Sequence, residues 1–354
     1  MSDSSETPDL STLAARLGLS PGTISRILSG QARKYRISKK TEERVLEEAR
    51  RTGMVVNQMA RALRMRTTRT IGLVMPDISN QFFASMARYI DAMAREIDHV
   101  ILFSDAQEDS GVEADAVRTM VGHRVDGVIL APVGEAVEAL ELLRNSRVPS
   151  VVIDRVVPGS GLPMVGNDNC DAARQAVLHL AKAGHRRIAC IRGLVSAHLD
   201  RGRIRGFRLA MEECGLSVNE DWIKGSDYLV ETAERATAEL MRLPVGSRPT
   251  AIIPLGTQIT LGSLAELRRM KVRVPDDVSV VGFGEQPWSG LVDPPLTTVE
   301  QPIEKMSVAA FKILFERIRN KSKEEPPQES LTLFPSRLID RESVAAPPEF
   351  AVKH

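Results

Sequence analysis

From residue 70 onward, the chain alternates short, uninterrupted apolar runs with segments of helical periodicity. Such runs are typical of strands buried on both faces of a parallel sheet, with helices between them. The strand-like runs lie at 70–75, 100–104, 127–132, 149–154, 187–191, 251–254 and 278–283. The helical patterns lie near 82–95, 112–122, 135–145, 171–183, 203–214, 231–242 and 258–270. Two successive series of this kind predict two doubly wound parallel-sheet lobes, with a ligand cleft where the carboxyl ends of their strands face each other.

The segment before residue 54 has the pattern of short helices instead. Asp9 is suited to cap a first helix, and the turn Gly18–Ser20 leads into a second helix, Pro21–Leu28. A third helix is expected after the cap Ser38. The apolar residues expected to face inward are Leu10, Leu13, Ala14, Leu17, Ile24, Ile27, Leu28, Val45, Leu46 and Ala49. Two short helices joined by a glycine-containing turn predict a helix-turn-helix unit, whose second helix enters the major groove of DNA.

The distribution of charge agrees with this interpretation. The chain has a net charge of +1, but residues 1–70 carry +7 and the remainder carries −6. A basic head on an acidic body is the pattern expected when the head meets phosphates. On charge alone, a solvated tail with chance charges remains an alternative.

Several other classes lack support in the sequence. No apolar run is long enough for a membrane helix, and the acidic N-terminus lacks the features of a secretory signal, so we expect a cytoplasmic protein without membrane contact. The three cysteines match no metal spacing and are interpreted as reduced thiols. Phosphate-binding, hydrolase and metalloprotease motifs are missing, and the histidines form no metal cluster. We therefore expect no enzyme, cofactor or metal site.

The run LAARLGLSPGTISRILSG, residues 13–30, resembles the head of the lactose-repressor (LacI) family. The resemblance implies that the turn serine and the helix after it face DNA. The residues carried over are Ser20, Pro21, Gly22, Thr23, Ser25 and Arg26. Arg26 is the best candidate for a bidentate contact with guanine. Because Pro21 and Gly22 offer no side-chain donor, the operator sequence stays open.

Two further segments of the basic region resemble family elements. The loop Arg33–Arg36 is similar to that of the fructose-repressor branch, and its Tyr35 either packs against the DNA backbone or belongs to a solvated loop. The run Asn57–Arg64 matches the family's hinge helix, in which Asn57 and Arg61 would contact DNA. Leu63 stands where a family leucine wedges into a minor-groove step, and so short a helix would form only beside its partner. The alternative is a basic linker with one stray leucine.

The body carries family blocks over about residues 60–345, including VVIDR and RGRIRGF. By the resemblance, the candidate effector-binding residues are Phe82, Phe83, Asp154, Asp168, Arg203, Tyr228, Thr257 and Glu285. Ordinary core packing is the alternative for the two phenylalanines, and a surface salt bridge is the alternative for Arg203. Asp154 and Asp168 either bond ligand hydroxyls or cap a helix.

Two departures from the family pattern bear on the ligand. Gly256-Thr257-Gln258 stands where the family has Asn-Asp, and Gly284 stands where an aspartate holds neutral sugar hydroxyls. With Arg201, Arg203 and Arg205 nearby, this favours an anionic ligand such as a sugar acid or sugar phosphate. The ligand's identity, and whether it releases or promotes DNA binding, stay open.

The sequence thus predicts an all-α helix-turn-helix head (1–56), a hinge (57–69) and a two-lobed α/β effector-binding body of the periplasmic-binding-protein type (70–345). The implied function is a transcriptional regulator, most simply a repressor, acting as a homodimer on palindromic operator DNA. A periplasmic-type solute-binding protein has the same two lobes and is the alternative, although it would lack residues 9–69.

Overall fold

The computed structural model describes residues 10–28, 30–52, 67–320 and 329–348. The chain divides into two compact units, 1–68 and 69–354. This division lies within the predicted hinge segment 57–69.

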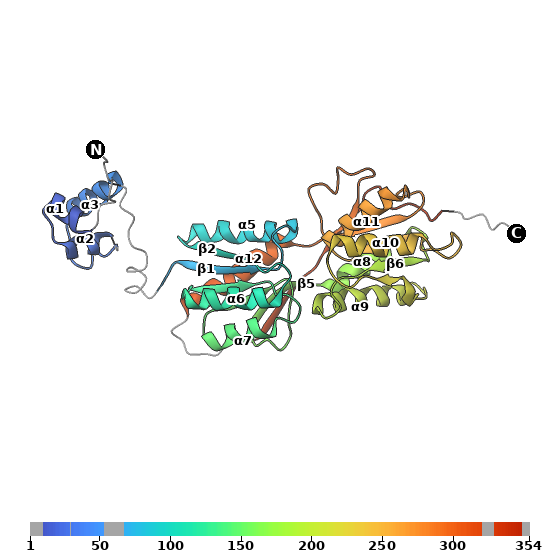
Figure 1. Ribbon diagram of the computed structural model, residues 1–354, viewed down its shortest axis with the longest axis horizontal. Coiled ribbons are helices and arrows are strands. Elements are labelled where there is room, and N and C mark those ends of the chain that lie inside the picture. The colour runs from blue at the N-terminus through green and yellow to red at the C-terminus, as the bar shows by residue number, and fades with distance from the viewer. Residues whose placement is uncertain (1–9, 29, 53–66, 321–328, 349–354) are drawn as a thin grey trace, which may run out of the picture. The chain divides into compact units, whose positions relative to one another are not determined.

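The first unit contains α1 (Leu10–Leu17), α2 (Pro21–Leu28) and α3 (Lys39–Arg51) (Figure 1). At the start of α2 the Ser20 hydroxyl accepts from the Thr23 amide at 3.1 Å, and at the start of α3 Ser38 caps Thr41 in the same way. These bonds satisfy amides that the first helical turn leaves open. The core of the unit consists of Leu13, Ala14, Ile24, Ile27, Leu28, Ala32, Val45 and Ala49. The predicted helices and nearly all of their predicted inner faces are therefore found; Leu10 is exposed, and Leu17 and Leu46 are half-buried.

The first lobe of the second unit is built on a six-stranded sheet of order β11-β5-β4-β3-β1-β2, in which the pairings are parallel. Its strands are β1 (Thr70–Met75), β2 (Val100–Asp105), β3 (Gly127–Leu130), β4 (Ser150–Ile153), β5 (Pro163–Asn167) and β11 (Ser330–Phe334). Its helices are α5 (Gln81–Glu96), α6 (Ser110–Gly122), α7 (Val137–Ser146) and α12 (Ile303–Arg319). Helices α5 and α12 cover one face of the sheet, and α6 and α7 cover the other.

The second lobe has a six-stranded sheet of order β12-β10-β9-β8-β6-β7, parallel except for the β10–β12 pair. Its strands are β6 (Ile188–Ile191), β7 (Ile223–Lys224), β8 (Ala251–Pro254), β9 (Ser279–Phe283), β10 (Thr297–Glu300) and β12 (Arg337–Ile339). Its helices are α8 (Asn169–Lys182), α9 (His198–Glu213), η1 (Glu220–Trp222), α10 (Val230–Met241) and α11 (Thr257–Arg269). Helices α8 and α9 cover one face, and α10 and α11 cover the other.

The chain passes between the lobes three times, after β5, β10 and β11. Two of these segments bond to each other: the Asp168 amide donates to the Phe334 carbonyl at 2.9 Å, and the Ser336 hydroxyl donates to the Asn167 side chain at 2.7 Å. All three segments leave from carboxyl ends of strands. This places the carboxyl edges of both sheets next to the crossings.

Helix α9 begins at His198, five residues before the helical pattern expected from 203. Its early turns contain Gly202 and Gly206, which interrupt the apolar pattern but let the helix approach α8. A Cβ atom at Gly206 would overlap the backbone carbonyl of Cys170. The close packing of these two helices therefore requires glycine at this point.

We predict that Gly206→Ala destabilises the second unit, because the added methyl group cannot be accommodated without moving α8. Overpacking of this kind costs on the order of 1–3 kcal/mol. Thermal unfolding should show a lower midpoint. Gly122→Ala is the matched control, since a Cβ there meets nothing within 4 Å; equal midpoints for the two variants would contradict the prediction.

Candidate DNA-recognition and effector sites

The face of α2 proposed to meet DNA is accessible. Ser20, Pro21, Gly22 and Arg26 are exposed, whereas Thr23 and Ser25 are half-buried. The Ser20 and Thr23 hydroxyls lie 2.9 Å apart, so the Ser20 hydroxyl is occupied by bonds that cap the start of the helix. Burial of Ile24, Ile27 and Leu28 fixes which face of α2 is turned outward.

Arg26 contacts Tyr35 of the basic loop. Its guanidinium carbon lies 4.2 Å from the centre of the Tyr35 ring, a cation–π arrangement that limits the rotamers of a long side chain. Tyr35 is 44% exposed, and Arg33, Lys34 and Arg36 around it are exposed too. The structure thus brings the two predicted residues into one surface. The hinge candidates Asn57, Arg61 and Leu63 lie outside the described residues.

In the second unit, Arg155 connects the two lobes. It follows β4, is only 5% exposed, and forms a fork with Glu108 through bonds of 2.7 and 2.5 Å. Its guanidinium lies 5.4 Å from the Phe83 ring centre in the first lobe and 5.1 Å from the Tyr228 ring centre in the second. Sequence reasoning did not single out Arg155, although it stands beside Asp154 in the VVIDR block.

Asp154 lies at the same strand end in a strained position. Its φ of +63° falls in the left-handed region, which a residue with a side chain rarely adopts. The carboxyl is buried, and its Oδ1 atom has no hydrogen-bond partner among the described residues. Burial raises the pKa of Asp154, while the charges of Arg203 and Arg155 act in the opposite direction. Most buried polar atoms are hydrogen-bonded, so this carboxyl is a candidate ligand group.

Arg203 projects from α9 into the same region and is 4% exposed. Its Nε donates to Asn169 at 2.8 Å, its Nη1 donates to the Leu255 carbonyl at 2.7 Å, and its guanidinium lies 4.2 Å from the Phe283 ring centre. Asn169 begins α8, Leu255 follows β8 and Phe283 ends β9. The arginine is therefore fixed in place by several carboxyl strand ends, and the surface salt-bridge alternative is wrong.

Tyr228 completes the cluster from the loop before α10. Its hydroxyl is buried and has no hydrogen-bond partner in the described part of the chain, and burial raises its pKa. The ring fits between strand ends because Gly193 and Gly256 lack side chains: a Cβ at Gly193 would overlap the ring, and one at Gly256 would lie 3.3 Å from it. Asp154, Arg155, Arg203 and Tyr228 are close enough to influence one another's ionisation.

The remaining predicted residues have structural partners. Asp168 caps α8 by accepting from the Asp171 amide at 3.0 Å, which is the cap alternative left open by the sequence. Glu285 forms a fork with Arg341 at 2.7 and 3.1 Å and accepts a short bond from the Thr298 hydroxyl. Phe82 and Phe83 are buried in the first-lobe core and contact edge to face at 5.1 Å.

The unusual Gly284 has a local explanation. Its φ of +89° favours glycine, and a Cβ there would overlap the hydroxyl of Thr257, the first residue of α11. The two departures from the family pattern are therefore linked. Arg201 and Arg205, which the sequence interpretation grouped with Arg203, are exposed and do not join the buried cluster. The second buried guanidinium of the cluster belongs to Arg155.

Other site types find no support in the described residues. They contain no group of three or more histidine, cysteine or acidic side chains placed to hold a metal ion. Within the same residues, no helix has the length and apolarity needed to cross a membrane.

A helix-turn-helix head joined to two α/β lobes with a buried charged cluster at their strand ends defines a ligand-responsive DNA-binding regulator. Residues 177–344 match the periplasmic binding protein-like domain family. The chain is 30% identical to the HTH-type transcriptional regulator DegA of Bacillus subtilis over 345 residues, 97% of this chain and 96% of DegA. It belongs to the LacI family of transcriptional regulators, and because the match includes the head, a solute-binding protein without a DNA role is not supported.

Two solved structures agree with this assignment. A CelR–cellobiose complex has a TM-score of 0.70 at 27% identity and covers 95% of this chain and 99% of that one. The lac repressor dimer bound to operator and the anti-inducer ONPF has a TM-score of 0.82 at 22% identity, covering 96% and 100%, and shows the same fold.

A buried carboxyl behind the cluster predicts a pH dependence of stability. The Glu113 Oε2 atom accepts from the Val133 amide at 2.6 Å, while Oε1 has no partner among the residues that the structure describes, and burial raises the pKa from 4.5 to about 7. Below pH 4.5 the group is protonated in folded and unfolded chains alike. As the pH rises to 7 the unfolded chain loses its proton first, so the folded state loses up to about 3 kcal/mol.

We predict that Glu113→Gln unfolds at a higher denaturant concentration than the wild type at pH 8, and that this advantage shrinks as the pH falls from 7 to 4.5. Urea titrations at several pH values measure it. Glu138→Gln, at a side chain that is 64% exposed, should show no such trend; a pH-independent difference for Glu113→Gln would refute the assignment.

Proposed function

We propose that this protein is a cytoplasmic, non-enzymatic repressor that binds palindromic operator DNA as a homodimer and responds to a small anionic effector. Its parts are the head (1–56), the hinge (57–69) and the effector-binding body (70–345). The observation that carries the proposal is the buried cluster, in which Asp154 Oδ1 and the Tyr228 hydroxyl have no partner within the described ranges. Each such atom costs about 1–3 kcal/mol, and a ligand that bonds to both would recover this.

On the DNA side, Arg26 is proposed to read a base and the basic loop to contact phosphates. Arg26 is exposed on the outer face of α2 and is oriented by Tyr35. Ser20, Thr23 and Ser25 would support the contact by fixing the start and surface of the helix. The hinge residues Asn57, Arg61 and Leu63 would add minor-groove contacts. A protein of the same fold, the lac repressor, has been solved as a dimer bound to operator DNA.

We predict that Arg26→Ala lowers affinity for an operator selected from a random duplex library by about 1–3 kcal/mol and relaxes preference at one base position. Arg33→Ala should weaken binding to all sequences alike and reduce the slope of binding against salt by about one. Fluorescence anisotropy at several salt concentrations measures both. If Arg26→Ala lowered all affinities uniformly, a base-reading role would be excluded.

On the effector side, the charges favour an anion. Arg155 is paired with Glu108, but Arg203 bonds only neutral groups among the described residues, and Asp154 has a raised pKa. A guanidinium fork suits carboxylate or phosphate oxygens, and Asp154 and Tyr228 suit hydroxyls. A sugar acid or sugar phosphate carries both kinds of group. Phe82, Phe83, Thr257, Asp168 and Glu285 would then shape the site, the last two through their structural bonds.

We predict that calorimetry over matched sugars, sugar acids and sugar phosphates finds tightest binding for an anionic member. Tyr228→Phe should weaken that binding about tenfold without lowering the unfolding midpoint, since it removes an unbonded buried hydroxyl. Tyr89→Phe, at a residue that is 40% exposed, is the control. A neutral sugar such as cellobiose binding far more tightly would overturn the anionic part of the proposal.

A further inference from the structure

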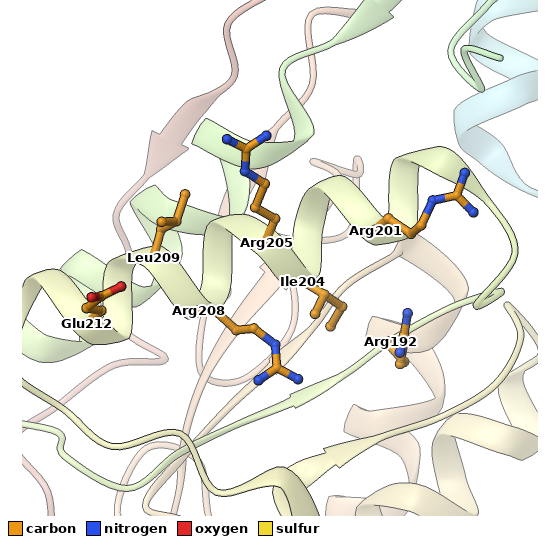
Figure 2. A pocket seen from close by; sticks show the side chains of 7 residues that line it. All are labelled: Arg192, Arg201, Ile204, Arg205, Arg208, Leu209 and Glu212. Atoms are coloured by element: carbon orange, nitrogen blue, oxygen red, sulfur yellow. The ribbon is translucent and has the colours of Figure 1, made fainter. Parts of the chain in front are cut away.

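A basic pocket that contains none of the buried-cluster residues lies on the outer side of α9. It is a pocket of about 360 Å³, and its lining is rich in arginine (Figure 2). The lining residues are Arg192, Arg201, Ile204, Arg205, Arg208, Leu209 and Glu212. In Figure 2, the Ile204 side chain lies between those of Arg192 and Arg208, and Arg201 extends from the start of the helix. The segment RGRIRGFR thus sends Arg203 inward and its other arginines outward.

Two of the pocket arginines are neutralised by carboxylates. Arg192 pairs with Asp200 through a bond of 2.8 Å from Nε and a second, shorter bond. Arg208 forms a fork with Glu220. These partners leave the guanidinium groups rigid, which suits them to a fixed ligand geometry.

The other two arginines form no ion pair with a carboxylate among the described residues, although Glu212 also lines the pocket. Arg201 donates to the Ser196 carbonyl at 2.5 Å, and Arg205 has no hydrogen bond or ion pair with any residue in the described part of the chain. They stand four positions apart on α9, where like charges repel each other and destabilise a helix. An anion bound between them would remove this repulsion.

The pocket also has an apolar wall. It consists of Leu209, which is 43% exposed, and Ile204, which is 8% exposed. A volume of this size is within the range of small-molecule sites. Arginine forks beside an apolar surface fit a compact phosphorylated molecule, with its phosphate on the guanidinium groups and its carbon skeleton against the leucine.

We propose that this pocket binds a small organic phosphate as a second ligand, distinct from the effector of the buried cluster. The pocket shares a wall with that cluster: the buried Asp200 carboxylate accepts from Arg192 and, at 2.9 Å, from the Gly193 amide, and Gly193 packs under the Tyr228 ring. The proposal does not depend on operator binding or on the nature of the effector.

Isothermal calorimetry of the full chain with inorganic pyrophosphate, at constant ionic strength, tests the proposal. We expect saturable binding with one site per chain, weakened at least tenfold in Arg201→Gln/Arg205→Gln. The matched control is Arg242→Gln/Arg268→Gln, which removes two charges from exposed positions on other helices and should bind as the wild type does. Thermal unfolding of each variant checks that it folds.

The variant Arg203→Lys separates the two sites. Binding that survives in Arg203→Lys and fails in Arg201→Gln/Arg205→Gln supports the outer pocket. Binding lost in Arg203→Lys but kept in the double variant would place pyrophosphate in the buried cluster and overturn the proposal. No binding to the wild type, or equal loss in the control double variant, would overturn it too.

Discussion

The guanidinium of Arg155 makes the contact that joins the two lobes of the second unit. It lies between an aromatic ring of the first lobe and one of the second, and Glu108 holds it there. A cation in a site that excludes water costs free energy unless it is paired, and the fork with Glu108 supplies that pairing. Because Arg155 follows Asp154 directly, the contact between the lobes and the carboxyl proposed to bind the effector share one strand end.

Much of the architecture could be predicted from the sequence because its signals are local. Helix caps such as Ser38 and the apolar spacing of α2 involve neighbours only a few residues apart. The central strands of both sheets are uninterrupted apolar runs, since helices cover them on both faces. Three unanticipated strands lack these signals: β11 is largely exposed, β7 has two residues, and β5 contains proline and glycine. Helix α12 and strands β10 and β12 were not anticipated either, although the buried residues of α12 have helical spacing.

The residues of the candidate site also divide into those with a signal in the sequence and those whose role depends on distant partners. Arg203 and Asp154 could be placed because they stand in family blocks, and the structure brings them together with Tyr228, a candidate that stands in none of those blocks. The role of Arg155 could not be read from its neighbours, because it depends on Tyr228, far along the chain. Glu285 looked like a ligand residue, but its partner Arg341 lies far along the chain and becomes visible only in three dimensions. For Asp168 the sequence left a helix cap open as the alternative, and the structure shows that cap. Arg201 and Arg205 are two positions from Arg203, yet the helical repeat turns them outward.

The three crossings between the lobes have a consequence for synthesis. Helix α12 and strand β11 complete the first lobe but come from the far end of the chain, after nearly all of the second lobe. On a ribosome, the head has all of its residues early, whereas one face of the first sheet is at first covered by α5 alone and β5 has one edge without its neighbour β11. A chain truncated before residue 303 would keep part of that apolar face exposed, which makes the last seventh of the chain a safeguard against aggregation of its first lobe.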